Sequence, residues 1–307
     1  MLISAFSGMD EYWSVGVVLM LERVEPTKVG VEMAMPASPL RIYVINLDRC
    51  TERWARMRSQ AIQFGLNIVR VAAIDGHSVD DEQRVGFHPR SFYFHNGRTI
   101  LAGEYGCYRS HLLALETFVL SGESMAIVVE DDVDLNPGLI PRAVEAVSAV
   151  SAVSSVKSGG RVIKLANHRK VGFRALASTV HGDVVGRCRH GPQGSAACYI
   201  VTRQAALNLL QTMDTMLLPF DVALERGWST GVETFSTEDN LVEFSPHRRD
   251  TTIGKRAHYR AVKPHFMLRI TTHWFRVHDQ MRRWFYATWA CHKMEHLPSS
   301  ARTQQAN

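Results

Sequence analysis

The stretch Ala126–Asp134, AIVVEDDVD, joins a short apolar run directly to a cluster of acids, and the rest of the chain is best understood from it. A continuous apolar run of this length is typical of a buried strand in a parallel sheet. In open α/β sheets, ligands bind just beyond the carboxyl ends of the strands. Here that end carries Glu130, Asp131, Asp132 and Asp134, which repel one another unless a cation holds them together. The stretch predicts a Mg²⁺ or Mn²⁺ site that can bind a diphosphate. The alternative interpretation of the acid cluster is a solvated turn or a helix cap.

The segments around this strand alternate between strand-like and helix-like patterns. Strand patterns occur at residues 40–47, 67–72, 126–130, 161–165 and 196–201, and helix patterns at residues 51–65, 102–121, 141–157 and 203–213. This order predicts an α/β fold with a Rossmann-like, mostly parallel sheet. We expect Asp48 to cap the first helix and Gly65 to end it.

Length and composition suit one large α/β domain with extensions. The chain has 307 residues, of which 46% are hydrophobic and 21% charged, as in an ordinary globular protein. We expect a poorly ordered extension at residues 1–38, the main domain at 39–256 and a basic helical tail at 257–307. The apolar run Val15–Leu21 is far shorter than the ~18–20 residues that span a bilayer. Acids precede it, so we expect no secretory signal.

The cysteines and the charge distribution bear on compartment and partners. Five cysteines without a CxxC pair favour free thiols in a reducing cytoplasm.

Residues 247–307 hold twelve Lys/Arg and three Asp/Glu, a net charge of +9, which leaves 23 minus 27, or −4, for the rest of the chain. Within this tail Ile270, Trp274, Val277, Met281 and Trp284 recur at helical spacing. This pattern predicts a peripheral membrane contact at the cytoplasmic face, with packing on the main domain as the alternative. We expect no nucleic-acid binding, because no recognition fold accompanies the charge.

Two further motifs carry groups that suit a phosphate ligand. In the first, YVINLDR at residues 43–49, Arg49 and Arg53 lie at the junction of a strand and a helix, where anions are favoured. A capped helix with solvated arginines is the alternative. In the second, GEYGCYRSH at residues 103–111, Ser110 and His111 diverge by about 100° on a helix, so they cannot pair as in a hydrolase triad. They are either donors that orient a ligand or, for His111, a buried structural residue.

Together with IVVEDDV at residues 127–133, ACYIVT at 197–202 and LPFD at 218–221, these motifs resemble glycosyltransferase family 25. That family contains lipopolysaccharide-type galactosyl- and glucosyltransferases and is similar to the collagen galactosyltransferases. The resemblance covers roughly residues 40–254. It implies a GT-A-type fold, a UDP-sugar donor, a saccharide or lipid-linked glycan acceptor, and inversion at the anomeric carbon.

The resemblance also implies roles for particular residues. It places the donor over Asn46, Arg49 and Arg53, with Glu104, Ser110 and His111 nearby. It makes Glu130, Asp131 and Asp132 the metal motif, and it puts Asp221 on the acceptor side.

Several assignments stay open. Asp132 belongs to either possible acid-x-acid pair, and Glu130 or Asp131 would be the second metal ligand beside it. If the strand stays extended, the side chains of Glu130, Asp132 and Asp134 point to one face of the sheet and that of Asp131 points to the other. His247, or Arg248 with Arg249, could complete the site. Asp221, Glu238 and Asp239 are candidates for the general base, and the resemblance favours Asp221. The rival functions are a non-catalytic membrane-associated glycan- or nucleotide-sugar-binding protein and a metal-dependent phosphatase.

Overall fold

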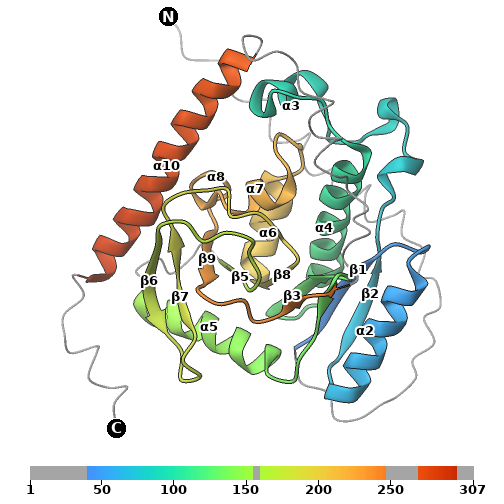
Figure 1. Ribbon diagram of the computed structural model, residues 1–307, viewed down its shortest axis with the longest axis vertical. Helices are drawn as coiled ribbons and strands as arrows, with labels where there is room; N and C mark the ends of the chain where they lie inside the picture. The colour runs from blue at the N-terminus through green and yellow to red at the C-terminus, as the bar shows by residue number, and fades with distance from the viewer. Residues whose placement is uncertain (1–39, 155–159, 247–268, 296–307) are drawn as a thin grey trace, which may run out of the picture. The chain divides into compact units, whose positions relative to one another are not determined.

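The computed structural model describes residues 40–154, 160–246 and 269–295 (Figure 1). The chain divides into two units, Met1–Pro36 and Ala37–Asn307, and all of the described elements belong to the second. The expected extension at residues 1–38 and the candidate ligands His247, Arg248 and Arg249 lie outside the described residues.

An eight-stranded sheet in the order β2-β1-β3-β8-β5-β9-β7-β6 forms the centre of the second unit. The pairings give β2, β1, β3, β5, β9 and β6 one direction and β8 and β7 the other, so six of the eight strands run the same way. The strands are β1 (Ile42–Asn46), β2 (Ile68–Ala72), β3 (Met125–Glu130), β5 (Arg161–Lys164), β6 (Phe173–Ser178), β7 (Val184–Cys188), β8 (Cys198–Thr202) and β9 (Glu233–Thr237). A separate pair joins β4 (Val133–Asp134) to β10 (Glu243–Phe244). The expected mixed α/β class with a mostly parallel sheet is confirmed.

Helices cover both faces of this sheet. They are α2 (Thr51–Phe64), α3 (Pro89–Asn96), α4 (Ala102–Leu120), α5 (Leu139–Val153), α6 (Arg203–Thr212), α7 (Phe220–Leu224), α8 (Gly227–Thr230) and α10 (Ile270–Glu295), with short 3₁₀ turns at Gly76–Ser78 and Asp81–Gln83. Successive side chains of β1 and β3 enter opposite cores, one shared with α2 and α5 and the other with α4, α6 and α7 (Figure 1). Because strands and helices alternate, the carboxyl ends of β1 and β3 meet at one edge of the sheet.

Local signals placed most helix ends correctly, and one prediction was wrong. Gly65 ends α2 in the left-handed conformation, with φ of 63°, as a C-cap glycine should. The N-cap of α2 is Cys50 and not Asp48. The Asp48 carboxylate instead accepts a hydrogen bond from Arg70 at 2.7 Å, a partner on β2 that the local sequence does not reveal.

The acids after β3 do not continue the strand. A turn at Asp131 and Asp132 separates β3 from β4, so the expected alternation of side chains is wrong. The Glu130 carboxylate meets His111 of α4, whereas Asp134 accepts a hydrogen bond from Gln60 of α2 at 3.1 Å. The acids are thereby divided between the two faces of the sheet.

Helix α10 lies along β7, β6, α8 and α3 (Figure 1). Thr272, Arg283 and Ala287 are buried, and Arg283 reaches the carboxylate of Glu225. The apolar residues of the predicted stripe are exposed, from 42% for Trp284 to 73% for Trp274. One face of α10 therefore packs on the main domain, as the second sequence alternative predicts, whereas the apolar stripe is exposed and the membrane contact stays a prediction. Among the described residues, no helix is both long and apolar enough to cross a bilayer.

Candidate active site

The carboxyl ends of β1 and β3 hold three of the predicted site residues in one hydrogen-bonded group. Asn46, the last residue of β1, donates from its amide to Asp131 at 2.7 Å and accepts from Arg70 at 2.9 Å. Arg53 of α2 donates to the other Asp131 oxygen at 3.1 Å. Burial alone would lower the pKa of Arg53, but the neighbouring Asp131 outweighs this and raises it, so the guanidinium stays charged. Asp131 is therefore turned toward β1 and α2, and both of its oxygens are engaged.

Arg49 lies apart from this group. Its guanidinium forms an ion pair with Asp75, which follows β2, and about half of the Arg49 side chain is exposed. The role of Arg49 in binding the donor stays a prediction.

His111 supports Glu130 from the other face of the sheet. Its Nε2 lies 3.2 Å from Oε1 of Glu130 and its Nδ1 lies 3.3 Å from the Tyr199 hydroxyl. The imidazole is fully buried and stacks on Phe220, with ring centroids 4.1 Å apart. His111 thus connects α4, β3, β8 and α7. Tyr199 and Phe220 lie in the motifs ACYIVT and LPFD, but their contacts with His111 were not predicted, because each residue is distant from His111 in the sequence.

Cys107, one helical turn before His111, completes a group with His111 and Glu130. The possible ligand atoms of these three residues all lie within 4.8 Å of one another. Burial raises the pKa of the Cys107 thiol well above its usual value, and the charges of Glu130, Asp221, Glu104 and Asp132 add to this effect. In the metal-free protein the thiol is therefore protonated at neutral pH.

The same carboxylates make the acid end of β3 suitable for a hard divalent cation. Asp132 lies within electrostatic reach of both Arg53 and Cys107, and its carbonyl accepts a hydrogen bond from Ser245 at 2.8 Å. Oxygen ligands from Asp132 and Glu130 are the type that Mg²⁺ and Mn²⁺ prefer. The residues present fit such a cation. Asp131 is less suited as a ligand, because Asn46 and Arg53 already occupy its two carboxylate oxygens.

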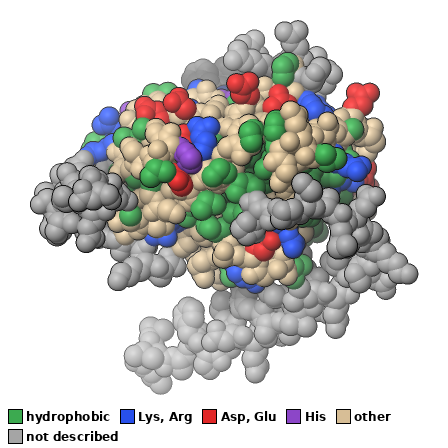
Figure 2. All heavy atoms as spheres, turned by 90° about the horizontal axis from the view of Figure 1, so that it is seen from below, with side chains coloured by type: hydrophobic (Ala, Val, Ile, Leu, Met, Phe, Trp, Pro, Cys, Tyr) green, Lys and Arg blue, Asp and Glu red, His purple; other side chains and the backbone are tan. Residues whose placement is uncertain are grey.

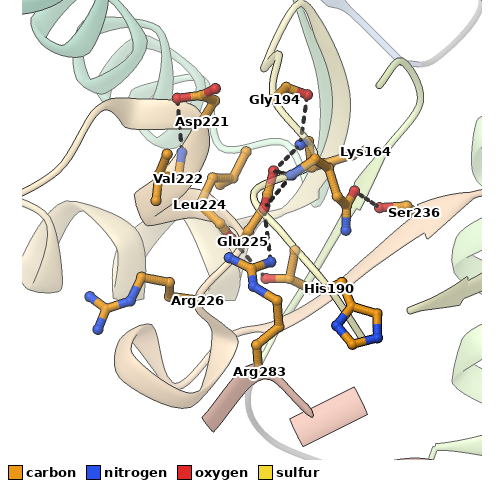
Figure 3. A network of polar contacts seen from close by, with 12 residues as sticks. Lys164, His190, Gly194, Asp221, Val222, Leu224, Glu225, Arg226, Ser236 and Arg283 are labelled. Carbon is orange, nitrogen blue, oxygen red and sulfur yellow. Dashed lines mark hydrogen bonds and ion pairs between the residues drawn. The ribbon is translucent and has the colours of Figure 1, made fainter. Parts of the chain in front are cut away.

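Asp221, at the start of α7, reaches the same region. Burial raises the pKa of its carboxyl, Glu225 adds to this and Lys164 opposes it, with a smaller contribution from Glu130 (Figure 3). The structure therefore brings the candidate base close to the acid end of β3. Asp239 and Glu238, the other candidates, are exposed after β9, where Asp239 acts electrostatically on Arg142 and Lys170.

Two residues assigned to the donor site make structural contacts. Glu104 accepts a bidentate ion pair from Arg98, with distances of 2.6 and 2.5 Å, and caps α4 by accepting from the Leu101 amide at 3.0 Å. The Ser110 hydroxyl donates to the Gly106 carbonyl at 2.6 Å and accepts from the Ile74 amide at 2.8 Å. Both side chains are buried, so their donor role stays a prediction.

The fold is therefore an α/β protein with a mostly parallel sheet, which carries acids after β3 and arginines at and just before the start of α2, after β1. The model of glycosyltransferase family 25 (LPS biosynthesis protein) matches residues 40–224, and the chain belongs to this family.

Comparison with individual proteins agrees with the family over shorter lengths. A glycosyltransferase 25 family member of Aedes aegypti is 32% identical over 100 residues, 31% of this chain and 16% of that protein. An inactive glycosyltransferase 25 family member 3 of Mus musculus is 32% identical over 96 residues, 30% of this chain and 16% of that protein. The chain thus matches only about a sixth of the length of these relatives. Among solved structures, the inositol-1-phosphate CTP transferase from T. maritima covers 70% of this chain and 94% of its own, with 11% identity and a TM-score of 0.31, too low to bear on the fold.

Proposed function

We propose that the chain is a metal-dependent, inverting glycosyltransferase. It would move galactose or glucose from a UDP-sugar to a saccharide acceptor, in lipopolysaccharide, lipooligosaccharide or another cell-envelope glycan. The observation that carries the proposal is that Glu130, Asp132 and Asp221, all inside the family match, act electrostatically on one residue, Cys107 of α4.

In this proposal the acceptor hydroxyl attacks the anomeric carbon while the bond from that carbon to the UDP oxygen breaks. Asp221 takes the hydroxyl proton, and its raised pKa makes it a better proton acceptor than an ordinary exposed carboxylate. Arg49 and Arg53 balance charge on the departing diphosphate. Asp239 is the alternative base.

Mn²⁺ or Mg²⁺ would be held by Asp132 with Glu130 and would supply Lewis-acid stabilisation of the leaving diphosphate. Asp131 is the alternative second ligand, but its contacts with Asn46 and Arg53 favour a role in fixing the turn. His247 stays a candidate for a further ligand.

A screen of UDP-sugars tests the proposal. UDP-galactose, UDP-glucose and their N-acetyl forms are incubated with Mn²⁺, with Mg²⁺ or with EDTA, and UDP release is measured with and without saccharide and lipid-linked acceptors. We expect release from one hexose donor that needs the metal and rises with acceptor. Release of inorganic phosphate from phosphomonoesters, without UDP release, would favour the phosphatase instead.

The alternative is a non-catalytic protein that binds a glycan or a nucleotide sugar. The inactive name of the mouse relative favours this alternative. Metal-dependent binding of UDP-sugar without release of UDP, for every donor and acceptor tested, would support it.

We further propose that the chain is a peripheral protein on the cytoplasmic face of a membrane and meets a lipid-linked acceptor there. The supporting observation is the exposed stripe of α10, formed by Ile270, Trp274, Val277, Met281 and Trp284. The net charge of +9 over residues 247–307 complements anionic lipid headgroups. On the face shown in Figure 2, acidic and basic side chains of the described residues are mixed, so this face shows no comparable single-sign patch.

Vesicle co-sedimentation tests this contact with the full-length chain. Deletion of the tail is unsuitable, because the opposite face of α10 contributes Arg283 and Tyr286 to the interior. We expect wild type to bind anionic vesicles and Trp274→Ala/Trp284→Ala to bind several-fold less. The control is Ile62→Ala, an equally exposed apolar residue on α2, 78% exposed. Equal binding by all three proteins, or none by wild type, would contradict the proposal.

A further inference from the structure

A buried cluster of charged side chains lies near Asp221 and joins four segments that are distant in the sequence (Figure 3). At its centre is the Glu225 carboxylate, whose side chain is 1% exposed. It accepts from Lys164 Nζ at 2.7 Å, from Arg283 Nη1 at 2.8 Å and from the Gln193 amide at 3.0 and 3.1 Å. Burial alone would raise the pKa of Glu225, but Lys164 and Arg283 outweigh this and lower it, so Glu225 is ionised.

The charges within the cluster do not cancel. Lys164 and Arg283 bring two positive charges to the single carboxylate of Glu225, and the Lys164 side chain is fully buried. A buried charge without a counter-charge is strongly unfavourable. Asp221 lies four residues before Glu225, and it is a second acid on which the charge of Lys164 acts, after Glu225 itself.

The geometry supports this coupling of Lys164 to Asp221. Lys164 Nζ donates to the Gly194 carbonyl at 3.3 Å, and a Cβ placed on Gly194 would lie 4.0 Å from Asp221 Oδ2. Gly194 has a φ of 73°, a backbone conformation that glycine adopts without steric cost. Lys164, Gly194 and Asp221 therefore share one neighbourhood.

We propose that Lys164, held by Glu225, is a positioning residue that keeps the partly buried Asp221 carboxylate ionised and oriented for its role as base. The inference rests on the proposed function only for what Asp221 does with a proton. The electrostatic coupling itself can be measured in the protein alone. The titratable groups that act on Asp221 or lie beside it are Lys164 of β5, Glu225 after α7, Glu130 of β3, Cys107 of α4 and His168, next to Gly194.

The test is titration of the Asp221 carboxyl by NMR in protein labelled with ¹³C at the aspartate carboxyl carbon, with Asp221→Asn identifying the signal. In Lys164→Gln, Glu225 keeps Arg283 and Gln193, and we expect the Asp221 midpoint to rise by about one pH unit or more. In Glu225→Gln the midpoint should fall, because the like charge is removed while Lys164 remains. Arg283→Gln is the matched control, because Arg283 binds the same carboxylate and is not among the leading influences on Asp221.

Activity is then measured across pH in the same variants. Lys164→Gln should lose about tenfold in kcat on the acid side of the profile, as the acid limb moves with the midpoint, while the donor KM changes little. An equal loss in Lys164→Gln and Arg283→Gln, with an unmoved Asp221 midpoint in every folded variant, would overturn the inference. If the midpoints move as expected but wild type has no UDP-sugar turnover, the coupling stands and the proposed function fails.

Discussion

Two buried carboxylates, Asp131 and Glu225, occupy comparable positions in the two halves of the sheet. Asp131 follows β3 and is held by Asn46 and Arg53, and Glu225 follows α7 and is held by Lys164 and Arg283. Beside each lies the acid to which we give the chemistry, Asp132 in one case and Asp221 in the other. In both places a carboxylate has both of its oxygens hydrogen-bonded, by one cation and a neutral amide for Asp131 and by two cations and a backbone amide for Glu225, and a nearby acid is the one proposed to act.

The two clusters differ in where the side chains that bind each carboxylate lie along the chain. Arg53 comes from the helix that directly follows β1, so it stands in the same motif as Asn46. Lys164 and Arg283 lie 61 and 58 residues from Glu225 along the chain. Asn46 and Arg53 therefore lie together in one strand–helix unit, but they are 85 and 78 residues from Asp131, so the first cluster also needs β3 to pack beside β1. In the second cluster the two positively charged side chains themselves come from separate elements, β5 and α10.

The largest expected effect separates Asp131 from Asp132. Asp132→Asn should reduce metal-dependent transfer to less than about a tenth of wild type while the fold is retained, because several kcal/mol of diphosphate stabilisation are lost. Asp131→Asn should instead lower the free energy of unfolding by roughly 3 kcal/mol, because Arg53 loses a buried partner. Turnover at saturating metal and urea unfolding distinguish the two variants. A folded Asp132→Asn protein with near-normal turnover would remove this residue from the metal site.

The second prediction concerns Glu225 and stability alone. Glu225→Gln leaves Lys164 and Arg283 buried with less counter-charge, so unfolding should become easier by about 3–5 kcal/mol. The control is Glu123→Gln, which breaks the partly exposed pair with Arg41 and should cost less than about 1 kcal/mol. Equal urea midpoints for the two variants would show that the buried cluster adds no more than a surface pair.

The third prediction compares the two arginines near β1. Arg49→Ala and Arg53→Ala should each weaken UDP binding by about tenfold, the loss expected for one charge-assisted hydrogen bond. Only Arg53→Ala should also lower stability, because Arg49 is half exposed and pairs with Asp75 near the surface. Calorimetric titration with UDP and thermal unfolding measure the two effects. Unchanged UDP affinity in both variants would favour the alternative, in which these arginines are solvated side chains near a helix start and do not bind the donor.

The same contrast explains what could be predicted from the sequence. The apolar runs and Gly65 placed the first strands and helix, and the motif containing Asn46 and Arg53 lies in the group around Asp131, because each of these signals is local. The turn at Asp131 and Asp132, the contact of Asp48 with Arg70 and the Glu225 cluster were not predicted, since each depends on tertiary packing. Helix α10 illustrates both cases. The helical spacing of its apolar residues predicted the apolar stripe, whereas the inward position of Arg283 depends on contacts with the rest of the domain and was not predicted.

The last prediction uses Asp221 and Glu225 as opposite dependences of stability on pH. Glu225 has a lowered pKa, so its contribution to stability is present above its unfolded value of 4.5 and is lost as the pH falls through the folded pKa. Asp221 has a raised pKa, so its contribution is present below its unfolded value of 3.8 and is lost as the pH rises through the folded pKa. At neutral pH the ionised Asp221 therefore costs stability.

Asp221→Asn should for this reason be at least as stable as wild type at pH 7 while losing turnover, and its advantage should shrink as the pH approaches 3.8. Glu225→Gln should show the reverse, with its deficit largest at neutral pH and smaller in acid. Urea unfolding of the three proteins at a series of pH values gives both curves. If Asp221→Asn is less stable than wild type at pH 7, Asp221 is a structural acid like Glu225, and Asp239 becomes the stronger candidate for the base.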